Sequence, residues 1–247
     1  MRLKNKVAIV TGAGTGIGKA IAHAFAAEGA RLVIGSRNRI NLERTAAELR
    51  RDYYATVTVV ITDVTNSNQV RRLFKKTMDE HGQLDILVNN AATGGYTPID
   101  QMSLGQWNDI VGVNLTGVFL CTREAMKIMK EKRSGRIINI GSISAERPRE
   151  NSAPYSTSKH AVWGLTKSTA LDGRPYGISC GQLNPGNTLV EWRAALEDVE
   201  GMNISEEPMI QVEDMARAAL YMATLPPEAS VLEMKVIPVA QPFIGRG

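Results

Sequence analysis

Short apolar runs rich in β-branched residues alternate with longer amphipathic stretches along most of the chain. The runs expected to form strands are Val7–Val10, Arg31–Gly35, Val57–Ile61, Ile86–Val88, Arg136–Ile140, Gly177–Leu183 and Val231–Ile237. The stretches with helical periodicity are Ile17–Glu28, Asn41–Arg50, Gln69–His81, Trp107–Lys130, Tyr155–Asp172 and Val212–Thr224. Regular alternation of this kind predicts a parallel sheet whose strands are joined by helices.

The composition of the strand runs narrows the fold further. Several of them are continuously apolar, which is typical of strands buried on both faces of a sheet. We therefore predict an α/β fold, a doubly wound, Rossmann-like parallel sheet of about seven strands with helices on both faces.

Overall composition argues against several classes of protein. The net charge is only +4, and no block of five or six basic residues concentrates it, so we expect neither nucleic-acid nor membrane binding. The apolar run Val7–Val10 is too short for a signal peptide, and nowhere do ~18 apolar residues run together. The two cysteines, Cys121 and Cys180, lack metal-binding spacing. A reduced, cytoplasmic location is therefore expected.

A glycine-rich turn follows the first expected strand and leads into an Ala-rich helix. It reads Thr11-Gly12-Ala13-Gly14-Thr15-Gly16-Ile17-Gly18. Glycines let a backbone turn tightly and bring its N–H groups close to a phosphate, and the helix N-terminus favours a pyrophosphate. Glycine also serves ordinary tight turns, but this position favours a dinucleotide site. The expected cofactor-binding residues here are Gly12, Gly14, Thr15, Gly16, Ile17 and Gly18.

The end of the second strand predicts which dinucleotide binds. About twenty residues after the glycine turn, a carboxylate commonly binds the adenosine ribose hydroxyls and repels a 2′-phosphate. Ser36 and Arg37 stand there instead. A guanidinium suits a 2′-phosphate, so the sequence favours NADP(H) over NAD(H). The alternative is that Arg37 only solvates the strand end.

Candidate catalytic residues lie at Ser142 and in the segment Tyr155-Ser156-Thr157-Ser158-Lys159. Tyr155 and Lys159 are four residues apart and share one face of a helix. A free tyrosine has a pKa of about 10, but a nearby ammonium favours the phenolate. Tyr155 would then exchange a proton with an alcohol or carbonyl oxygen. A partly exposed surface pair is the alternative.

Taken together, these motifs resemble the short-chain dehydrogenase/reductase family in its short single-domain form. Thr11–Gly18 matches the family's glycine-rich turn, and Asp63-Val64 matches its adenine-contacting acid. Asn89-Asn90-Ala91-Ala92 matches its NNAG element, with alanine in place of the usual glycine. Asn114, Ser142, Tyr155 and Lys159 match its catalytic tetrad. The resemblance spans nearly the whole chain and implies one dinucleotide-binding and catalytic domain over residues 1–247.

The resemblance implies a role for each matched residue. Tyr155 is the general acid/base, Lys159 binds the ribose and lowers the phenol pKa, Ser142 holds the substrate oxygen, and Asn114 supports a water-linked proton relay. Asp63, Val64, Asn90, Ala91, Pro185, Gly186 and Thr188 complete the implied cofactor contacts, although the family's usual threonine is replaced by Val190. The implied activity is interconversion of a secondary alcohol and a ketone, without a metal.

Two regions bear on substrate and assembly. The pattern of Leu232, Glu233, Met234, Pro238 and Gln241 resembles the branch that oxidises 3-hydroxy acids and related small alcohols. The family commonly forms tetramers through its long helices, so a homo-oligomer, either tetramer or dimer, is expected. The apolar tail after Pro238 packs either on a neighbouring subunit or on its own chain. Residues 186–210 form either a substrate lid or an ordinary surface excursion.

Other features are given lesser roles. His23, His81 and His160 are isolated and show no ligand spacing, so core or surface roles are expected rather than a metal site. The charged stretch Glu146–Glu150 either lies in solvent or lines the pocket mouth and favours anionic substrates. NAD(H) as the cofactor, or a nucleotide-binding regulator without catalysis, are the alternative hypotheses.

Overall fold

A computed structural model of the chain describes residues 1–190 and 207–244. Its main sheet has seven strands, all parallel, in the order β3-β2-β1-β4-β5-β6-β9. The strands are β1 (Val7–Thr11), β2 (Arg31–Ser36), β3 (Val57–Ile61), β4 (Ile86–Asn89), β5 (Gly135–Ile140), β6 (Ile178–Pro185) and β9 (Glu233–Val236). The order reverses between β1 and β4, which is the switch point of a doubly wound fold. The prediction of a Rossmann-like sheet is confirmed.

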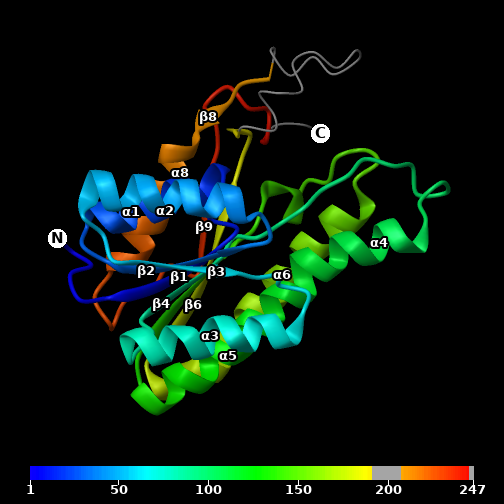
Figure 1. Cartoon of the computed structure of the whole chain (residues 1–247). Coiled ribbons are helices and arrows are strands. Elements are labelled where there is room, and N and C mark those ends of the chain that lie inside the picture. The colour runs from blue at the N-terminus through cyan, green and yellow to red at the C-terminus, as the bar shows by residue number, and fades with distance from the viewer. Residues whose placement is uncertain (191–206, 245–247) are drawn as a thin grey trace.

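Helices cover both faces of this sheet, as Figure 1 shows. On one face lie α1 (Gly16–Ala27), α2 (Arg39–Tyr53) and α8 (Val212–Thr224). On the other lie α3 (Ser67–His81), α5 (Gly117–Lys132) and α6 (Ala153–Gly173). Each face has its own apolar core, and Ala8 and Val10 contribute to one while Val7 and Ile9 contribute to the other. This alternation explains why β1 reads as a continuous apolar run.

The single helix predicted over Trp107–Lys130 is in fact three segments. α4 (Leu104–Val111) continues into a π-helical turn (Gly112–Thr116), and α5 follows without a break. The turn inserts an extra residue that an apolar repeat does not reveal. Gly117 just after it packs closely, because an added Cβ there would lie 2.6 Å from Val64 Cγ2. The predicted stretch is thus helical throughout and begins three residues earlier, at Leu104, and only the π-helical turn within it was not predicted.

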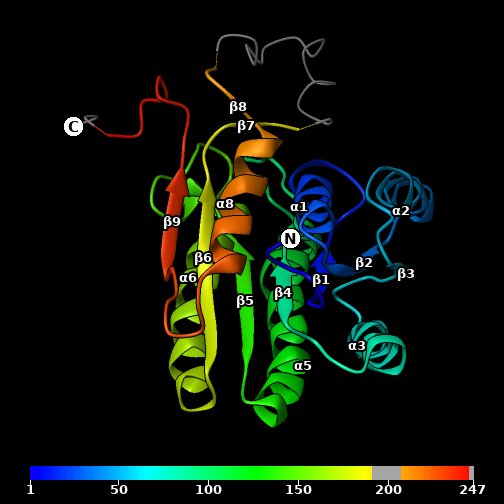
Figure 2. The same cartoon turned by 90° about the vertical axis from the view of Figure 1, so that its left-hand side faces the viewer.

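Several short elements lie at the carboxyl edge of the sheet and at the end of α6. Two 3₁₀ turns span Ile143–Ala145 and Arg174–Tyr176. Strand β7 (Thr188–Leu189) pairs with β8 (Ile210–Gln211). In Figure 2 this pair lies beyond the ends toward which the arrows of β6 and β9 point. The lid predicted at 186–210 falls mainly on residues 191–206, which lie outside the described residues.

Some strand boundaries differ from the predictions, because β6 runs on through Pro185 and β9 is confined to Glu233–Val236.

Within residues 1–190 and 207–244, no helix combines the length and apolarity needed to cross a membrane.

Candidate active site

A cavity of about 800 Å³ lies at the carboxyl edge of the sheet. Residues that the sequence singled out line it from the ends of six strands of the main sheet, from the start of α6 and from β7. They are Gly12, Gly14, Thr15, Gly16, Ile17, Ser36, Arg37, Asp63, Val64, Asn90, Ala91, Ser142, Tyr155, Lys159, Pro185, Gly186 and Thr188. Two other candidates, Gly18 and Asn114, do not line this cavity and lie behind its wall. The fold thus brings together residues more than 170 positions apart in sequence.

Asn90 holds the glycine-rich turn against the sheet. Its side-chain amide donates to the carbonyl oxygens of Thr11 and Gly12, at 3.0 and 3.2 Å. Gly12 has a φ of +67°, and a Cβ there would lie 2.9 Å from Ala91 Cα. At Gly18 a Cβ would lie 2.3 Å from Asn90 Nδ2 and 2.4 Å from Gly12 O. Glycine is therefore required at position 18 so that the turn can pack against Asn90. Gly18 contributes to this packing and does not line the cavity.

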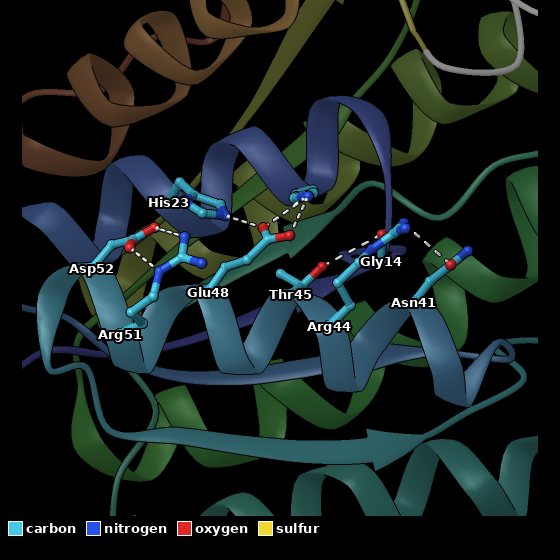
Figure 3. A network of polar contacts seen from close by, with 9 residues as sticks. Gly14, His23, Asn41, Arg44, Thr45, Glu48, Arg51 and Asp52 are labelled. Carbon is cyan, nitrogen blue, oxygen red and sulfur yellow. Dashed lines mark hydrogen bonds and ion pairs between the residues drawn. The ribbon is translucent and has the colours of Figure 1, made fainter.

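Helix α2 supports the same turn from the side (Figure 3). The buried hydroxyl of Thr45 donates to the carbonyl oxygen of Gly14 at 3.4 Å. A Cβ at Gly14 would lie 3.0 Å from Asn41 Cβ, so the absence of a side chain lets the start of α2 pack closely against the turn. The sequence analysis did not single out Thr45 or Asn41. No sequence signal could have found them, because their partner Gly14 is distant along the chain.

An ion-paired cluster strengthens this joint between α1 and α2. Glu48 on α2 accepts from Lys19 and His23 on α1, with its Oε2 at 2.8 and 3.2 Å from their nitrogens. Burial acts to raise the pKa of Glu48, but the two basic groups outweigh it and hold that pKa below its ordinary value. His23 is thus part of a helix–helix contact, which agrees with the structural role expected for it.

The adenosine end of the cavity lies at the ends of β2 and β3. Ser36 and the exposed Arg37 line it from β2. Asp63 lines it from β3, where its Oδ1 accepts from the backbone N and the hydroxyl of Thr65 at 2.9 and 2.8 Å. Asn38 caps α2 by accepting from the N–H of Asn41. The wall from β2 and the start of α2 presents an arginine and amides, and no carboxylate, to the cavity.

Tyr155 and Lys159 lie one turn apart at the start of α6. Lys159 Nζ is 5.6 Å from the centre of the Tyr155 ring and donates to the carbonyl oxygen of Ile140 at 2.8 Å. Only 3% of Lys159 is exposed, and burial lowers the pKa of its amine to about 8. Burial and this hydrogen bond therefore hold the lysine in place, with its amine over the Tyr155 ring.

Ser142 follows β5 and is positioned by Asn184. The backbone N–H of Ser142 donates to Asn184 Oδ1 at 3.0 Å. Gln182 Nε2 donates to the same oxygen at 2.8 Å, and Asn184 Nδ2 donates to Glu233 Oε1 at 2.8 Å. The Ser142 hydroxyl accepts from Ser144 N at 3.1 Å and lines the cavity. Asn184 was not among the predicted site residues, and no sequence pattern indicates this role of its side chain.

Asn114 occupies the π-helical turn and is 1% exposed. Its Oδ1 accepts from the backbone N–H of Thr93 at 2.8 Å, and its Nδ2 donates to Thr93 O at 2.9 Å and to Ser158 Oγ at 3.2 Å. Ser158 immediately precedes Lys159. Asn114 therefore joins the loop after β4 to the helix that carries Tyr155 and Lys159.

Comparisons with known proteins agree with this arrangement. Residues 6–201 match the family described as short chain dehydrogenase. An uncharacterized oxidoreductase of Staphylococcus aureus (strain USA300) is 35% identical, over 96% of this chain and 99% of that protein. The chain belongs to the short-chain dehydrogenase/reductase family. Its members are NAD(P)-dependent dehydrogenases and reductases, and this chain is an enzyme of that class.

Two solved structures show the same fold. An alcohol dehydrogenase from the archaeon Thermococcus sibiricus, complexed with 5-hydroxy-NADP, has a TM-score of 0.85 and 26% identity, covering 96% of this chain and 97% of that one. A variant of actinorhodin polyketide ketoreductase with NADPH has a TM-score of 0.88 and 29% identity, with the same coverage of both chains.

We predict that Gly141→Ala destabilises the protein through Asn184. An added Cβ at Gly141 would lie 2.0 Å from Asn184 Oδ1 and 2.6 Å from Gln182 Nε2. The crowded amides must move, and the buried N–H of Ser142 then loses its acceptor. We expect the free energy of unfolding in urea to fall by about 1–3 kcal/mol.

Gly164→Ala is the matched control for this substitution. It lies within α6, and an added Cβ meets nothing within 4 Å. It should leave stability unchanged or raise it by about 0.5–1 kcal/mol. Equal stability of the Gly141→Ala and Gly164→Ala proteins would contradict the role given to Asn184.

Proposed function

We propose that the protein is an NADP(H)-dependent oxidoreductase that interconverts a secondary alcohol and a ketone, with Tyr155 as general acid/base. The observation that carries the proposal is the juxtaposition of Tyr155, Ser142 and the buried Lys159 in one cavity with the glycine-rich turn. The whole chain then acts as a single dinucleotide-binding and catalytic domain.

Lys159 acts on Tyr155 through charge. A free phenol has a pKa of about 10 and releases its proton poorly near neutrality. An ammonium fixed 5.6 Å from the ring stabilises the phenolate because an opposite charge at that range favours the ionised form. Each unit by which the phenol pKa falls corresponds to about 1.4 kcal/mol of such stabilisation. The carbonyl of Ile140 keeps the amine in place.

The remaining residues position the reacting groups. The Ser142 hydroxyl hydrogen-bonds the substrate oxygen, and Tyr155 takes the alcohol proton in oxidation or donates it to the forming alkoxide in reduction. Asn114 supports a water-linked proton relay toward Lys159 by holding the Thr93 backbone and Ser158. When bound, the nicotinamide accepts or supplies the hydride.

The residues present fit a dinucleotide with a 2′-phosphate. The glycine-rich turn lines the cavity with Gly12, Gly14 and Gly16, and Arg37 supplies a cation where a carboxylate would otherwise favour NAD(H). The two solved structures named above hold NADPH or an NADP derivative, which supports the same preference. NAD(H) use is the competing hypothesis, and the arginine favours NADP(H).

Three further proposals concern substrate and setting. The Leu232–Gln241 pattern favours a 3-hydroxy acid or a similar small alcohol. Phe119 on α5 and Leu171 on α6 are exposed apolar side chains on the helices that carry the expected subunit contacts, which supports a homo-oligomer, tetramer or dimer. A cytoplasmic location suits the two free, buried cysteines.

A regulator without catalysis would gain nothing from the buried lysine beside Tyr155.

Tyr155→Phe should abolish turnover while sparing the cofactor. Removing the hydroxyl eliminates the proton exchange, so we expect kcat for ketone reduction to fall at least about 100-fold. The dissociation constant for NADPH, followed by fluorescence, should change less than about threefold. Tyr176→Phe, in the 3₁₀ turn that precedes β6, is the control and should retain full turnover. Turnover in Tyr155→Phe at the level of the control would overturn the assignment.

Arg37→Ala should weaken NADPH binding selectively. A charge-assisted pair to the 2′-phosphate is lost, so the dissociation constant for NADPH should rise about 10- to 100-fold. That for NADH should change less than about threefold, because it carries no phosphate there. Arg39→Ala is the control, since Arg39 is exposed two residues further on and does not line the cavity. Equal losses for both cofactors would refute the NADP(H) preference.

A further inference from the structure

Arg149 is a charged group in the cavity to which the proposed reaction assigns no role. Among residues 1–190 and 207–244, the charged side chains that line the cavity are Arg37, Asp63, Arg149 and Lys159. Arg37 and Asp63 lie at the adenosine end. Lys159 already donates to the Ile140 carbonyl, and its amine lies over the Tyr155 ring. Tyr155 and Tyr96 are among the groups that act to raise the Arg149 pKa. Arg149 lines the same cavity as Tyr155, Ser142 and Tyr96.

The backbone of Arg149 is fixed relative to the catalytic helix. The buried hydroxyl of Ser152 lies 2.6 Å from the carbonyl oxygen of Arg149, to which it donates, and 2.9 Å from the hydroxyl of Ser156 on α6. Asn151 O accepts from the N–H of Thr97 at 2.8 Å. Ser152 begins α6, although its side chain does not cap the helix. The loop that carries Arg149 is thus tied to the turn that carries Tyr155.

The guanidinium binds a carboxylate of the protein itself. Its two terminal nitrogens donate to Glu207 Oε1 and Oε2 at 2.8 and 3.1 Å, and Nη2 also donates to Asn187 Oδ1 at 2.6 Å. Asn187 Nδ2 donates to Glu207 Oε2 at 2.9 Å, so the three side chains form a closed ring. Hydrogen bonding to Glu207, more than its charge, raises the Arg149 pKa. The paired geometry is the one in which arginine recognises carboxylates.

Exposure and position indicate that Arg149 can exchange its ion pair with Glu207 for one with another carboxylate. The side chains of Arg149 and Glu207 are 38% and 35% exposed, and ion pairs that water reaches contribute little stability. Asn187 follows Pro185-Gly186 directly and is 7% exposed. Arg149 and Asn187 line the cavity, whereas Glu207 is not among its lining residues. An anion inside the cavity can therefore reach Arg149 and Asn187, and to bind them it must replace their hydrogen bonds to Glu207.

We propose that Arg149, with Asn187, binds a carboxylate of the substrate, and that Glu207 competes for the same guanidinium until the substrate arrives. The proposal rests on the proposed function and deepens it. The substrates are keto acids and the corresponding hydroxy acids, and Arg149 determines the preference for an acid over a neutral ketone. Its role is recognition, while Tyr155 and Ser142 act on the reacting oxygen.

The test compares acids with their esters. Initial rates of NADPH oxidation are measured with 2-ketobutanoate, 3-ketobutanoate and 4-ketopentanoate, each beside its methyl ester, because the panel varies the distance from ketone to carboxylate. The quantity compared is the acid-to-ester ratio of kcat/KM. In the unaltered enzyme at least one acid should exceed its ester. In Arg149→Met that ratio should fall about 10- to 100-fold, mainly through KM for the acid.

Three variants separate recognition from structure. Arg149→Lys keeps the charge and should recover part of the ratio. Glu207→Gln removes the competing carboxylate and should lower KM for the acid. Arg147→Met, at an exposed residue of the same loop outside the cavity, should leave the ratio unchanged. NADPH binding, measured in every variant, shows that each protein is folded.

The outcomes are distinct. An equal loss of kcat/KM for acid and ester in Arg149→Met would mean that the ring only supports the loop, and would overturn the inference. Turnover of esters with no preference for any acid would overturn it while leaving the proposed function standing. No turnover of any compound would overturn both.

Discussion

A lysine amine buried beside a phenol is the interaction on which the proposed chemistry of this site depends. Lys159 is 3% exposed and is held by the Ile140 carbonyl at the end of β5. Burial alone makes charge unfavourable there and lowers the lysine pKa to about 8. The pKa of Lys159 is therefore shifted toward neutral pH, and the amine lies over the ring of Tyr155. The proposed reaction needs this phenol to be stabilised as a phenolate.

Amide side chains fix the surroundings of that pair. Asn90 holds the glycine-rich turn, Asn114 joins the loop after β4 to α6, and Asn184 holds the backbone of Ser142. Each amide both donates and accepts, so one side chain links two separate segments without carrying charge. Few charged side chains line the cavity among the described residues. The charge of Arg149 is for this reason an indication of which substrate binds.

Motif order and apolar periodicity were sufficient to predict the sheet, its helices and about half of the residues that line the cavity. Periodicity arises from burial, so it identifies strands such as β1 directly. It does not reveal the π-helical turn at Asn114, because one inserted residue barely alters the apolar pattern. It also does not reveal Thr45 or Asn184, whose partners Gly14 and Ser142 are distant in sequence. Those contacts depend on how the strands and helices are placed together.

Titration of the Tyr155 phenol by its phenolate absorbance tests the central claim most directly. The signal is the difference between the unaltered protein and Tyr155→Phe, recorded across pH with the oxidised cofactor bound. The same difference is then measured on a Lys159→Met background. The account predicts that removing the lysine raises the midpoint of the phenol titration by at least about one pH unit. An unchanged midpoint would show that the buried ammonium does not control the phenol, and would contradict the account.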